Sequence, residues 1–208
     1  DPVEYQLPLI RQSSVREGSG MDFLNGIKSL MRQDPDIIFV GEVRDEDTAL
    51  MAVRAALTGH QVFTTLHTND AVGAVTRLAD LGVPRFLIAS AVLGVAAQRL
   101  VRKICPHCMV WGEPTGAERL SFPEGFELPE RVPHPVGCSE CDGTGYKGRT
   151  GIFELLVVDD NLREGIVRGD SDSALRRISG MKPLFYDGLE KVASGATSLE
   201  EVLRVGVR

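Results

Sequence analysis

The sequence predicts an α/β fold with a parallel sheet, followed by a metal-binding segment and a helical C-terminal region. Up to Gly82, segments with apolar residues at helical spacing alternate with short β-branched runs, an order typical of right-handed crossovers between parallel strands. Two Cys-x-x-Cys pairs then lie in a stretch rich in proline and poor in periodic apolar positions. With 43% hydrophobic and 25% charged residues among 208, the composition is that of a globular protein with a sizeable core.

The first helix is predicted over 19–33 and the first strand over 36–40. Apolar residues recur every three or four positions in the helix, which is expected to end at Asp34-Pro35 because a residue before proline avoids the α region. The run 36–40 is short, continuous and β-branched. Such a run predicts a strand that is buried on both of its faces.

The next three elements follow from residues that begin or end helices. Asp45 is expected to cap a helix over 46–57, and Asp70 is expected to begin another helix, which ends at Gly82. The short apolar run 61–66 between them predicts a second strand. Helix and strand therefore alternate, as a parallel sheet requires.

The second half of the chain changes character at Cys105. The segment 83–104 predicts a long apolar helix with a basic end, and 152–158 predicts a strand. Short amphipathic helices follow, and Ser198 with Glu201 three residues later predicts a capping box. These signals divide the chain into three consecutive regions: a sheet-forming segment over 1–104, a tetracysteine segment over 105–151, and a strand with C-terminal helices over 152–208.

The four cysteines form two pairs, Cys105 with Cys108 and Cys138 with Cys141. Each pair offers two thiolates from one tight turn, and two such turns close the tetrahedral site that structural zinc prefers. The alternative is four unrelated buried or free cysteines in a reducing compartment. The sequence therefore predicts bound Zn2+, with His107 left outside the ligand set.

Polar residues follow both predicted strands of the sheet-forming segment. Glu42 follows 36–40 after a single glycine, and His67 comes directly after 61–66, so both are expected at the carboxyl edge of a parallel sheet, where α/β proteins hold ligands. A carboxylate there suits a base or a Mg2+ contact, and a histidine there suits the sensing of a phosphate. The alternatives are a helix-capping acid for Glu42 and a hydrogen-bonded core histidine for His67.

Several classes of site are disfavoured by the sequence. None of the five lysines follows a glycine, so the chain lacks the Gly-Lys-Ser/Thr of a P-loop. The pattern Gly-x-Gly-x-x-Gly over 143–148 precedes a strand instead of opening a helix, and its glycines are expected to shape turns of the metal segment. A net charge of −6 argues against a binder of nucleic acid, and no apolar run approaches the roughly 20 residues that cross a bilayer.

Five stretches together resemble the secretion/traffic ATPases, the hexameric motors of type II secretion and type IV pilus assembly. They are 32–45, 58–69, the tetracysteine element, the tail 187–203, and the opening 1–5, which resembles the end of the aspartate box. The resemblance implies a partial RecA-like P-loop NTPase core with a parallel sheet, followed by a zinc-binding subdomain and a small helical subdomain. Because retraction motors generally lack the tetracysteine element, it favours a secretion or assembly motor.

The resemblance also implies roles for single residues. Glu42 would be the Walker B carboxylate that polarises the attacking water, and His67 of the histidine box would report the γ-phosphate. Asp1 and Glu4 of the aspartate box would organise Mg2+ and water. Arg44 is expected to lie across this cluster from Glu42.

The resemblance further implies ATP and Mg2+ as cofactors of the complete protein. The chain begins without an initiator methionine or a signal-peptide pattern, which indicates a piece of a longer protein. The Walker A lysine is therefore expected before Asp1, and the isolated chain is expected to hydrolyse no ATP. The complete protein would form a homo-hexamer at the cytoplasmic face of a bacterial inner membrane, with a membrane platform protein and cytoplasmic adaptors as partners.

A second hypothesis from another class is a zinc-ribbon interaction module without enzymatic activity. Such a module would bind nucleic acid through basic residues near the cysteines: Arg99, Arg102, Lys103, Lys147 and Arg149. These charges are few in an acidic chain, so they are better explained as solvated helix-end and loop residues.

Overall fold

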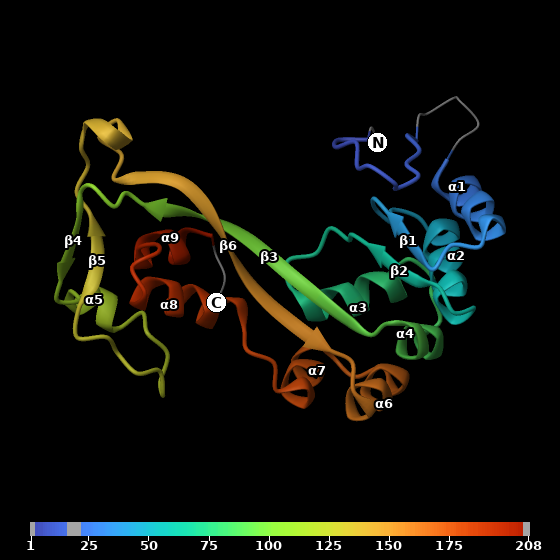
Figure 1. Ribbon diagram of the computed structural model, residues 1–208. Coiled ribbons are helices and arrows are strands. Elements are labelled where there is room, and N and C mark those ends of the chain that lie inside the picture. The colour runs from blue at the N-terminus through green and yellow to red at the C-terminus, as the bar shows by residue number, and fades with distance from the viewer. Residues whose placement is uncertain (1–2, 16–21, 206–208) are drawn as a thin grey trace. The chain divides into compact units, whose positions relative to one another are not determined.

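The computed structural model describes residues 3–15 and 22–205 (Figure 1). The chain forms two compact units: unit 1 comprises Asp1–Val95 and Val157–Gly180, and unit 2 comprises Ala96–Leu156 and Met181–Arg208. These units cut across the three consecutive regions expected from the sequence. The expected regions rest on composition and motifs, and they stay a prediction.

Within the described residues, unit 1 contains the strands β1 and β2 and a series of helical segments. In chain order the elements are α1 (Phe23–Leu30), the 3₁₀ turn η1 (Met31–Gln33), β1 (Ile37–Val40), α2 (Glu46–Leu57), β2 (Gln61–Thr64), α3 (Ala71–Asp80), α4 (Arg85–Ala91), α6 (Asp160–Arg168) and α7 (Asp172–Ser179). Helices α6 and α7 return to this unit and pack against α4 and α3 respectively.

Strands β1 and β2 pair in parallel, as the alternation of elements predicted, with Phe39 opposite Phe63. Ile38 and Val40 are buried, whereas Ile37 and Phe39 are 63% and 67% exposed. The predicted burial on both faces is therefore wrong. Successive side chains of a strand point to opposite faces, and within the described residues α1 and α2 contact this strand pair from the side of the buried side chains.

Helices α2 and α3 begin at the predicted cap residues. The Asp45 carboxylate accepts a hydrogen bond from the backbone N–H of Thr48 at 2.8 Å, and the Asp70 carboxylate accepts one from Gly73 at 2.7 Å. The first helix is shorter than predicted, because α1 passes into the 3₁₀ turn. Its expected residues 19–21 lie outside the described residues.

The predicted long helix over 83–104 is wrong. Only α4 is helical in this segment, and strand β3 (Gly94–Ile104) follows it. Exposure alternates from one residue to the next over the first half of β3, which is the period of a strand. Strand β3 pairs with β6 (Tyr146–Val157), and their arrows point in opposite directions in Figure 1. This pairing with a distant segment overrides the local apolar pattern that predicted a helix.

Unit 2 is built on β3 and β6. Its other elements are β4 (Met109–Gly112), α5 (Gly116–Arg119), β5 (Val132–Pro135), the 3₁₀ turn η2 (Ser139–Cys141), α8 (Leu184–Ala193) and α9 (Leu199–Arg204). Strands β4 and β5 are antiparallel. The predicted strand over 152–158 is the second half of β6, and the predicted helical C-terminal region is confirmed.

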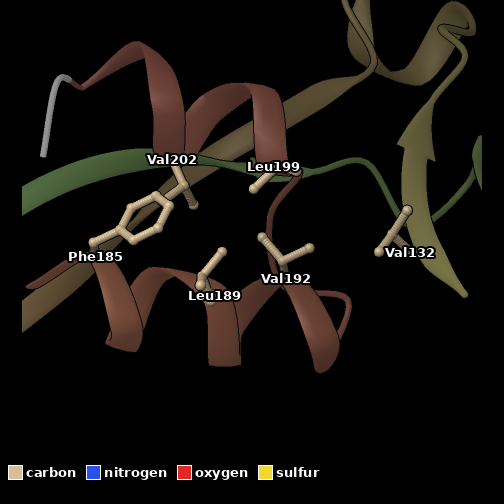
Figure 2. Close-up of a cluster of buried hydrophobic side chains, with 6 residues drawn as sticks. All are labelled: Val132, Phe185, Leu189, Val192, Leu199 and Val202. Carbon is tan, nitrogen blue, oxygen red and sulfur yellow. The ribbon is translucent and has the colours of Figure 1, made fainter. Parts of the chain in front are cut away.

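A cluster of buried apolar side chains holds α8, α9 and β5 together (Figure 2). Side chains from α8 and α9 point toward one another, and one side chain from β5 lies beside them. Burial of each of these side chains stabilises the fold by about 2 kcal/mol. The cluster consists of Val132, Phe185, Leu189, Val192, Leu199 and Val202.

The capping box predicted at the start of α9 is only half formed. The Ser198 hydroxyl accepts a hydrogen bond from the backbone N–H of Glu201 at 3.3 Å. The Glu201 carboxylate does not return to the cap, because it accepts hydrogen bonds from Arg102 and Arg204 instead. Among the described residues, no helix has both the length and the apolar character that crossing a bilayer requires.

Candidate functional site

Glu42 and His67 follow the two parallel strands of unit 1 and lie at the same edge of the sheet. Two hydrogen bonds tie the segments that carry them. The Thr65 hydroxyl donates to the Gly41 carbonyl at 2.6 Å, and the Val43 N–H donates to the Thr65 carbonyl at 3.2 Å. These bonds continue the pairing of β1 and β2 beyond the last strand residues and fix the position of the Glu42 backbone.

The Glu42 carboxylate faces two basic side chains. The His67 Nε2 lies 3.3 Å from Glu42 Oε2, and the Arg44 Nε donates to the same oxygen at 2.5 Å. Glu42 itself is only 6% exposed, whereas the side chains of His67 and Arg44 are 85% and 64% exposed. The structure therefore brings together three of the five predicted site residues around one buried carboxylate.

The plain alternatives for these two residues do not fit the geometry. Asp45, not Glu42, caps the helix that follows β1. His67 is mostly exposed, so it is not a core histidine. Both side chains instead face each other at the carboxyl ends of parallel strands, which is where α/β folds hold ligands.

The charge state of Glu42 follows from its neighbours. The hydrogen bond from Arg44 is the largest influence and lowers the pKa of the carboxyl below its usual value; burial opposes this effect, and His67 adds to it. The group is therefore ionised at neutral pH. A carboxylate of lowered pKa is a weak proton acceptor, so this arrangement suits the orientation of a water molecule or a contact to Mg2+ better than full proton abstraction.

The structure describes only part of the predicted aspartate box. Asp1 lies outside the described residues. Glu4 is exposed, and within residues 3–15 and 22–205 no hydrogen bond or ion pair joins it to Glu42, Arg44 or His67. Their predicted role with Mg2+ stays a prediction.

The four cysteines of unit 2 converge on one point. Sγ separations are 3.9 Å between Cys105 and Cys138, 3.7 Å between Cys108 and Cys141, and 3.8 Å between Cys138 and Cys141. Four sulfurs bound to one zinc ion at about 2.3 Å stand about 3.8 Å apart. All four thiols are free, and their mutual distances are far longer than the S–S bond of a disulfide. The donor set therefore fits one tetrahedral zinc ion.

Backbone N–H groups surround these sulfurs. Gly137 donates to Cys108 Sγ at 3.3 Å, and Cys138 and Gly145 donate to Cys141 Sγ at 3.2 Å. Burial raises the pKa of the Cys141 thiol, but these two donors outweigh it and lower the pKa to about 6. Burial raises the pKa of the Cys108 thiol to about 11. A zinc ion would hold all four groups as thiolates.

The glycines near the cysteines shape the metal loop, as the sequence predicted. Gly143, Gly145 and Gly148 all have positive φ angles. A Cβ on Gly145 would lie 2.5 Å from the Pro135 side chain, so the turn requires glycine there. The dinucleotide interpretation is excluded by this context, since no helix begins at these residues. His107 is exposed and is not a member of the sulfur cluster.

The basic residues of the alternative hypothesis are partly engaged in ion pairs. Arg102 binds the buried Glu201 carboxylate, and Lys147 binds Glu140 at 3.2 Å. Arg99 also has an interaction partner. A surface that binds nucleic acid needs cations that are available to phosphates, and these engaged side chains do not favour one.

Comparison with known proteins identifies the family. Residues 1–204 match the family described as Type II/IV secretion system protein. The chain belongs to this family. It is 50% identical over 208 residues to the Type IV pilus assembly ATPase PilB of Thermus thermophilus, across 98% of this chain and 23% of that protein. It is 48% identical over 209 residues to Type II secretion system protein E of Aeromonas hydrophila, across 99% of this chain and 41% of that protein.

Solved structures show the same fold. The pilus retraction motor PilT with bound ADP matches with a TM-score of 0.62 and 26% identity, over 89% of this chain and 43% of PilT. The Legionella pneumophila ATPase DotB matches with a TM-score of 0.59 and 22% identity, over 88% of this chain and 42% of DotB. The chain thus spans less than half the length of these relatives. The α/β class with a parallel sheet and the family predicted from the sequence are confirmed.

Proposed function

We propose that this chain belongs to an ATPase that powers type II secretion or type IV pilus assembly, and that Glu42 orients the water molecule that attacks ATP. The observation that carries this proposal is the buried Glu42 carboxylate 3.3 Å from His67 Nε2 at the carboxyl ends of two parallel strands. Phosphoryl transfer leaves a protein mainly to position groups and to stabilise charge. An ionised carboxylate with a neighbouring imidazole meets that need.

Each residue of the cluster has a distinct proposed role. His67 responds to the γ-phosphate, which its exposure permits, and Arg44 keeps Glu42 ionised and balances its charge. Asp1 and Glu4 contribute to Mg2+ and water. The phosphate-binding lysine comes from sequence outside this chain, and a closed homo-hexamer brings groups of neighbouring subunits to each site.

The tetracysteine segment 105–151 is proposed to hold Zn2+ as a structural ion. With four sulfurs close together, no coordination position is left for a substrate, so the ion would brace the fold and do no chemistry. The proposed partners are a membrane platform protein and cytoplasmic adaptors at the cytoplasmic face of the inner membrane. Nucleic acid is not among them.

The test is Glu42→Gln in the complete protein that contains this chain. Loss of the carboxylate should lower kcat for ATP hydrolysis by about 100-fold or more, because the attacking water loses its orienting group. Binding of a fluorescent ATP analogue should stay close to that of the parent protein, since Glu42 acts in the chemical step. A steady-state phosphate-release assay and a binding titration measure the two effects.

Asp47→Asn is the matched control, because it also converts a carboxylate to an amide nearby, on the exposed side of α2. It should hydrolyse ATP at the parental rate. A Glu42→Gln protein as active as this control would contradict the proposal. The proposal would also be contradicted if the isolated chain hydrolysed ATP and Glu42→Gln abolished that activity, because the phosphate-binding lysine is proposed to lie outside this chain.

A further inference from the structure

The position of His67 depends on its backbone, not on packing of its ring. Its side chain is 85% exposed, and within the described part of the chain its ring hydrogen-bonds with Glu42 Oε2. An exposed ring of this kind moves with the loop that carries it. Whatever holds the loop between Thr65 and Asp70 therefore sets the distance between His67 and Glu42.

The start of this loop is anchored to the sheet. The Thr65 hydroxyl donates to the Gly41 carbonyl at 2.6 Å, and the Thr65 carbonyl accepts from the Val43 N–H at 3.2 Å. Within the loop, the Thr68 N–H donates to the Leu66 carbonyl at 3.1 Å. The start of the loop thus moves together with the segment that carries Glu42.

The end of the loop is held by helix α3. The Thr68 hydroxyl donates to the Asp70 carbonyl at 3.0 Å, and Asp70 Oδ1 caps the helix at the Gly73 N–H. Little space surrounds this cap, since a Cβ on Gly73 would lie 3.2 Å from Asp70 Oδ1. The orientation of the Asp70 carboxylate therefore determines how the loop meets the helix.

Helix α7 holds the other oxygen of that carboxylate. Arg176 Nη2 lies 3.0 Å from Asp70 Oδ2, and both side chains are about one-third exposed. A second bond between the same helices runs from the Thr76 hydroxyl to Asp172 Oδ1 at 2.5 Å. Arg176 lies far from Asp70 in sequence, so it ties the C-terminal segment of unit 1 to the loop of His67.

We propose that Arg176 is a positioning residue: through Asp70 it holds the loop that places His67 opposite Glu42. Its effect on ATP hydrolysis rests on the function proposed above, whereas its effect on the loop does not. An ion pair with an N-cap carboxylate leaves only small displacements open to the loop. Because displacements of about 1 Å in a site cost large factors in rate, this restraint reaches the chemistry.

The first test compares Arg176→Ala with Arg177→Ala in the complete protein. Arg177 is the matched control, because it is the next residue of α7, is exposed, and makes no hydrogen bond or ion pair with another residue that the structure describes. Arg176→Ala should lower kcat about three- to tenfold with little change in KM for ATP. Arg177→Ala should leave both constants unchanged, and Arg176→Lys, which keeps the charge, should restore most of the rate.

A double-mutant cycle separates positioning of His67 from a general loss of structure. In a His67→Ala background, Arg176→Ala should cause no further loss of kcat, since the residue it positions is gone. Equal losses with and without His67 would overturn the proposal. Glu42→Gln, measured alongside, reports separately whether the proposed site hydrolyses ATP.

Hydrogen exchange tests the loop without any reference to activity. In Arg176→Ala the amides of 66–73 should exchange at least roughly threefold faster than in the parent protein, while those of β1 and α2 stay unchanged and show that the fold is intact. Exchange over 66–73 identical to that of Arg177→Ala would overturn the proposal, whatever the outcome for Glu42. Faster exchange over 66–73, together with unchanged ATP hydrolysis in Glu42→Gln, would leave the loop restraint standing and contradict only the proposed function.

Discussion

Each compact unit contains a buried glutamate that faces basic side chains, Glu42 in unit 1 and Glu201 in unit 2, and the two sites differ in how those basic side chains are held. In unit 1, Glu42 is 6% exposed, but its partners Arg44 and His67 remain largely in solvent. In unit 2, Glu201 is fully buried and its partners are Arg102 and Arg204.

One partner of Glu201, Arg102, is held by further contacts. Its carboxylate accepts the backbone N–H of Arg102 at 2.9 Å as well as the guanidinium at 2.6 Å. The Arg102 guanidinium also lies 4.1 Å from the centre of the Tyr146 ring, and the Tyr146 hydroxyl lies 2.6 Å from the Ser198 hydroxyl. This cluster joins β3, β6 and α9, so its carboxylate serves the fold.

Burial of a glutamate therefore does not by itself mark a functional site. A carboxylate whose cations are held by other contacts has no freedom to exchange partners. A carboxylate whose cations are exposed can release them to a ligand at modest cost, because water replaces the lost contact. Glu42 belongs to the second kind. The tetracysteine cluster resembles the Glu201 site, because its sulfur atoms also face one another and leave no position for a further ligand.

The largest effect is expected from breaking the tetracysteine cluster with Cys108→Ser. Binding of structural zinc contributes on the order of 10 kcal/mol to folding, and the segment around the cysteines has few apolar side chains to replace it. Zinc content, measured on protein purified without chelator, should fall from about one ion per chain. Thermal unfolding of unit 2 should move to a much lower temperature.

Ser139→Ala is the control, because Ser139 is exposed within the second cysteine turn. It should keep both its zinc and its unfolding temperature. A parent protein without zinc, or a Cys108→Ser variant as stable as the control, would show that the stability of this region does not depend on a metal.

A smaller effect is expected from Glu201→Gln. Burial raises the pKa of the Glu201 carboxyl, but the hydrogen bonds from Arg204 and Arg102 outweigh it and lower the pKa from 4.5 to about 2. Because the pKa of this carboxyl is lower in the folded protein than in the unfolded chain, its ionised form stabilises the fold. At pH values above the unfolded-state pKa this contribution is about 3 kcal/mol. This contribution is complete above pH 4.5 and is lost as the pH falls toward about 2. Urea unfolding across this range measures it.

The difference between parent protein and Glu201→Gln should therefore be largest near neutral pH and shrink in acid. Loss of metal in acid affects both proteins alike and cancels in this difference. Glu200→Gln is the matched control, since Glu200 is the exposed neighbour on the same helix. A difference that does not change with pH would mean that Glu201 acts through packing and not through its charge.

Local signals in the sequence predicted the elements that depend on neighbouring residues. The caps Asp45 and Asp70, the parallel strand pair and the cysteine cluster were all predicted, because each needs only short spacings or regular alternation. The approach of Glu42 to His67 was predicted from topology, since the carboxyl ends of adjacent parallel strands must meet at one edge.

Features that depend on distant segments were not predicted. Strand β3 was assigned to a helix, because its partner β6 lies beyond nearly the whole tetracysteine segment. Arg176 carried no signal, since nothing in the sequence shows that α7 returns to the start of α3. Glu201 likewise forms an ion pair instead of completing the capping box, because strand β3 brings Arg102 to it.

The smallest effect on stability is expected from Glu42→Gln. The carboxylate has a lowered pKa and is ionised above pH 4.5, but its removal leaves Arg44 and His67 in solvent, so no charge becomes buried without a partner. The amide also retains an oxygen that accepts the hydrogen bond from Arg44. The thermal midpoint of the variant should therefore stay close to that of the parent protein, in contrast to the large loss of activity proposed above.

Asp45→Ala sets the scale for this measurement, because it removes the N-cap of the next helix and should cost about 1 kcal/mol. Asp45→Asn should restore that loss, since asparagine caps helices as well as aspartate does. Glu42→Gln should shift the midpoint less than Asp45→Ala. A larger shift would place Glu42 with Glu201 among the carboxylates that hold the fold together, and it would remove the distinction on which the proposed role of Glu42 depends.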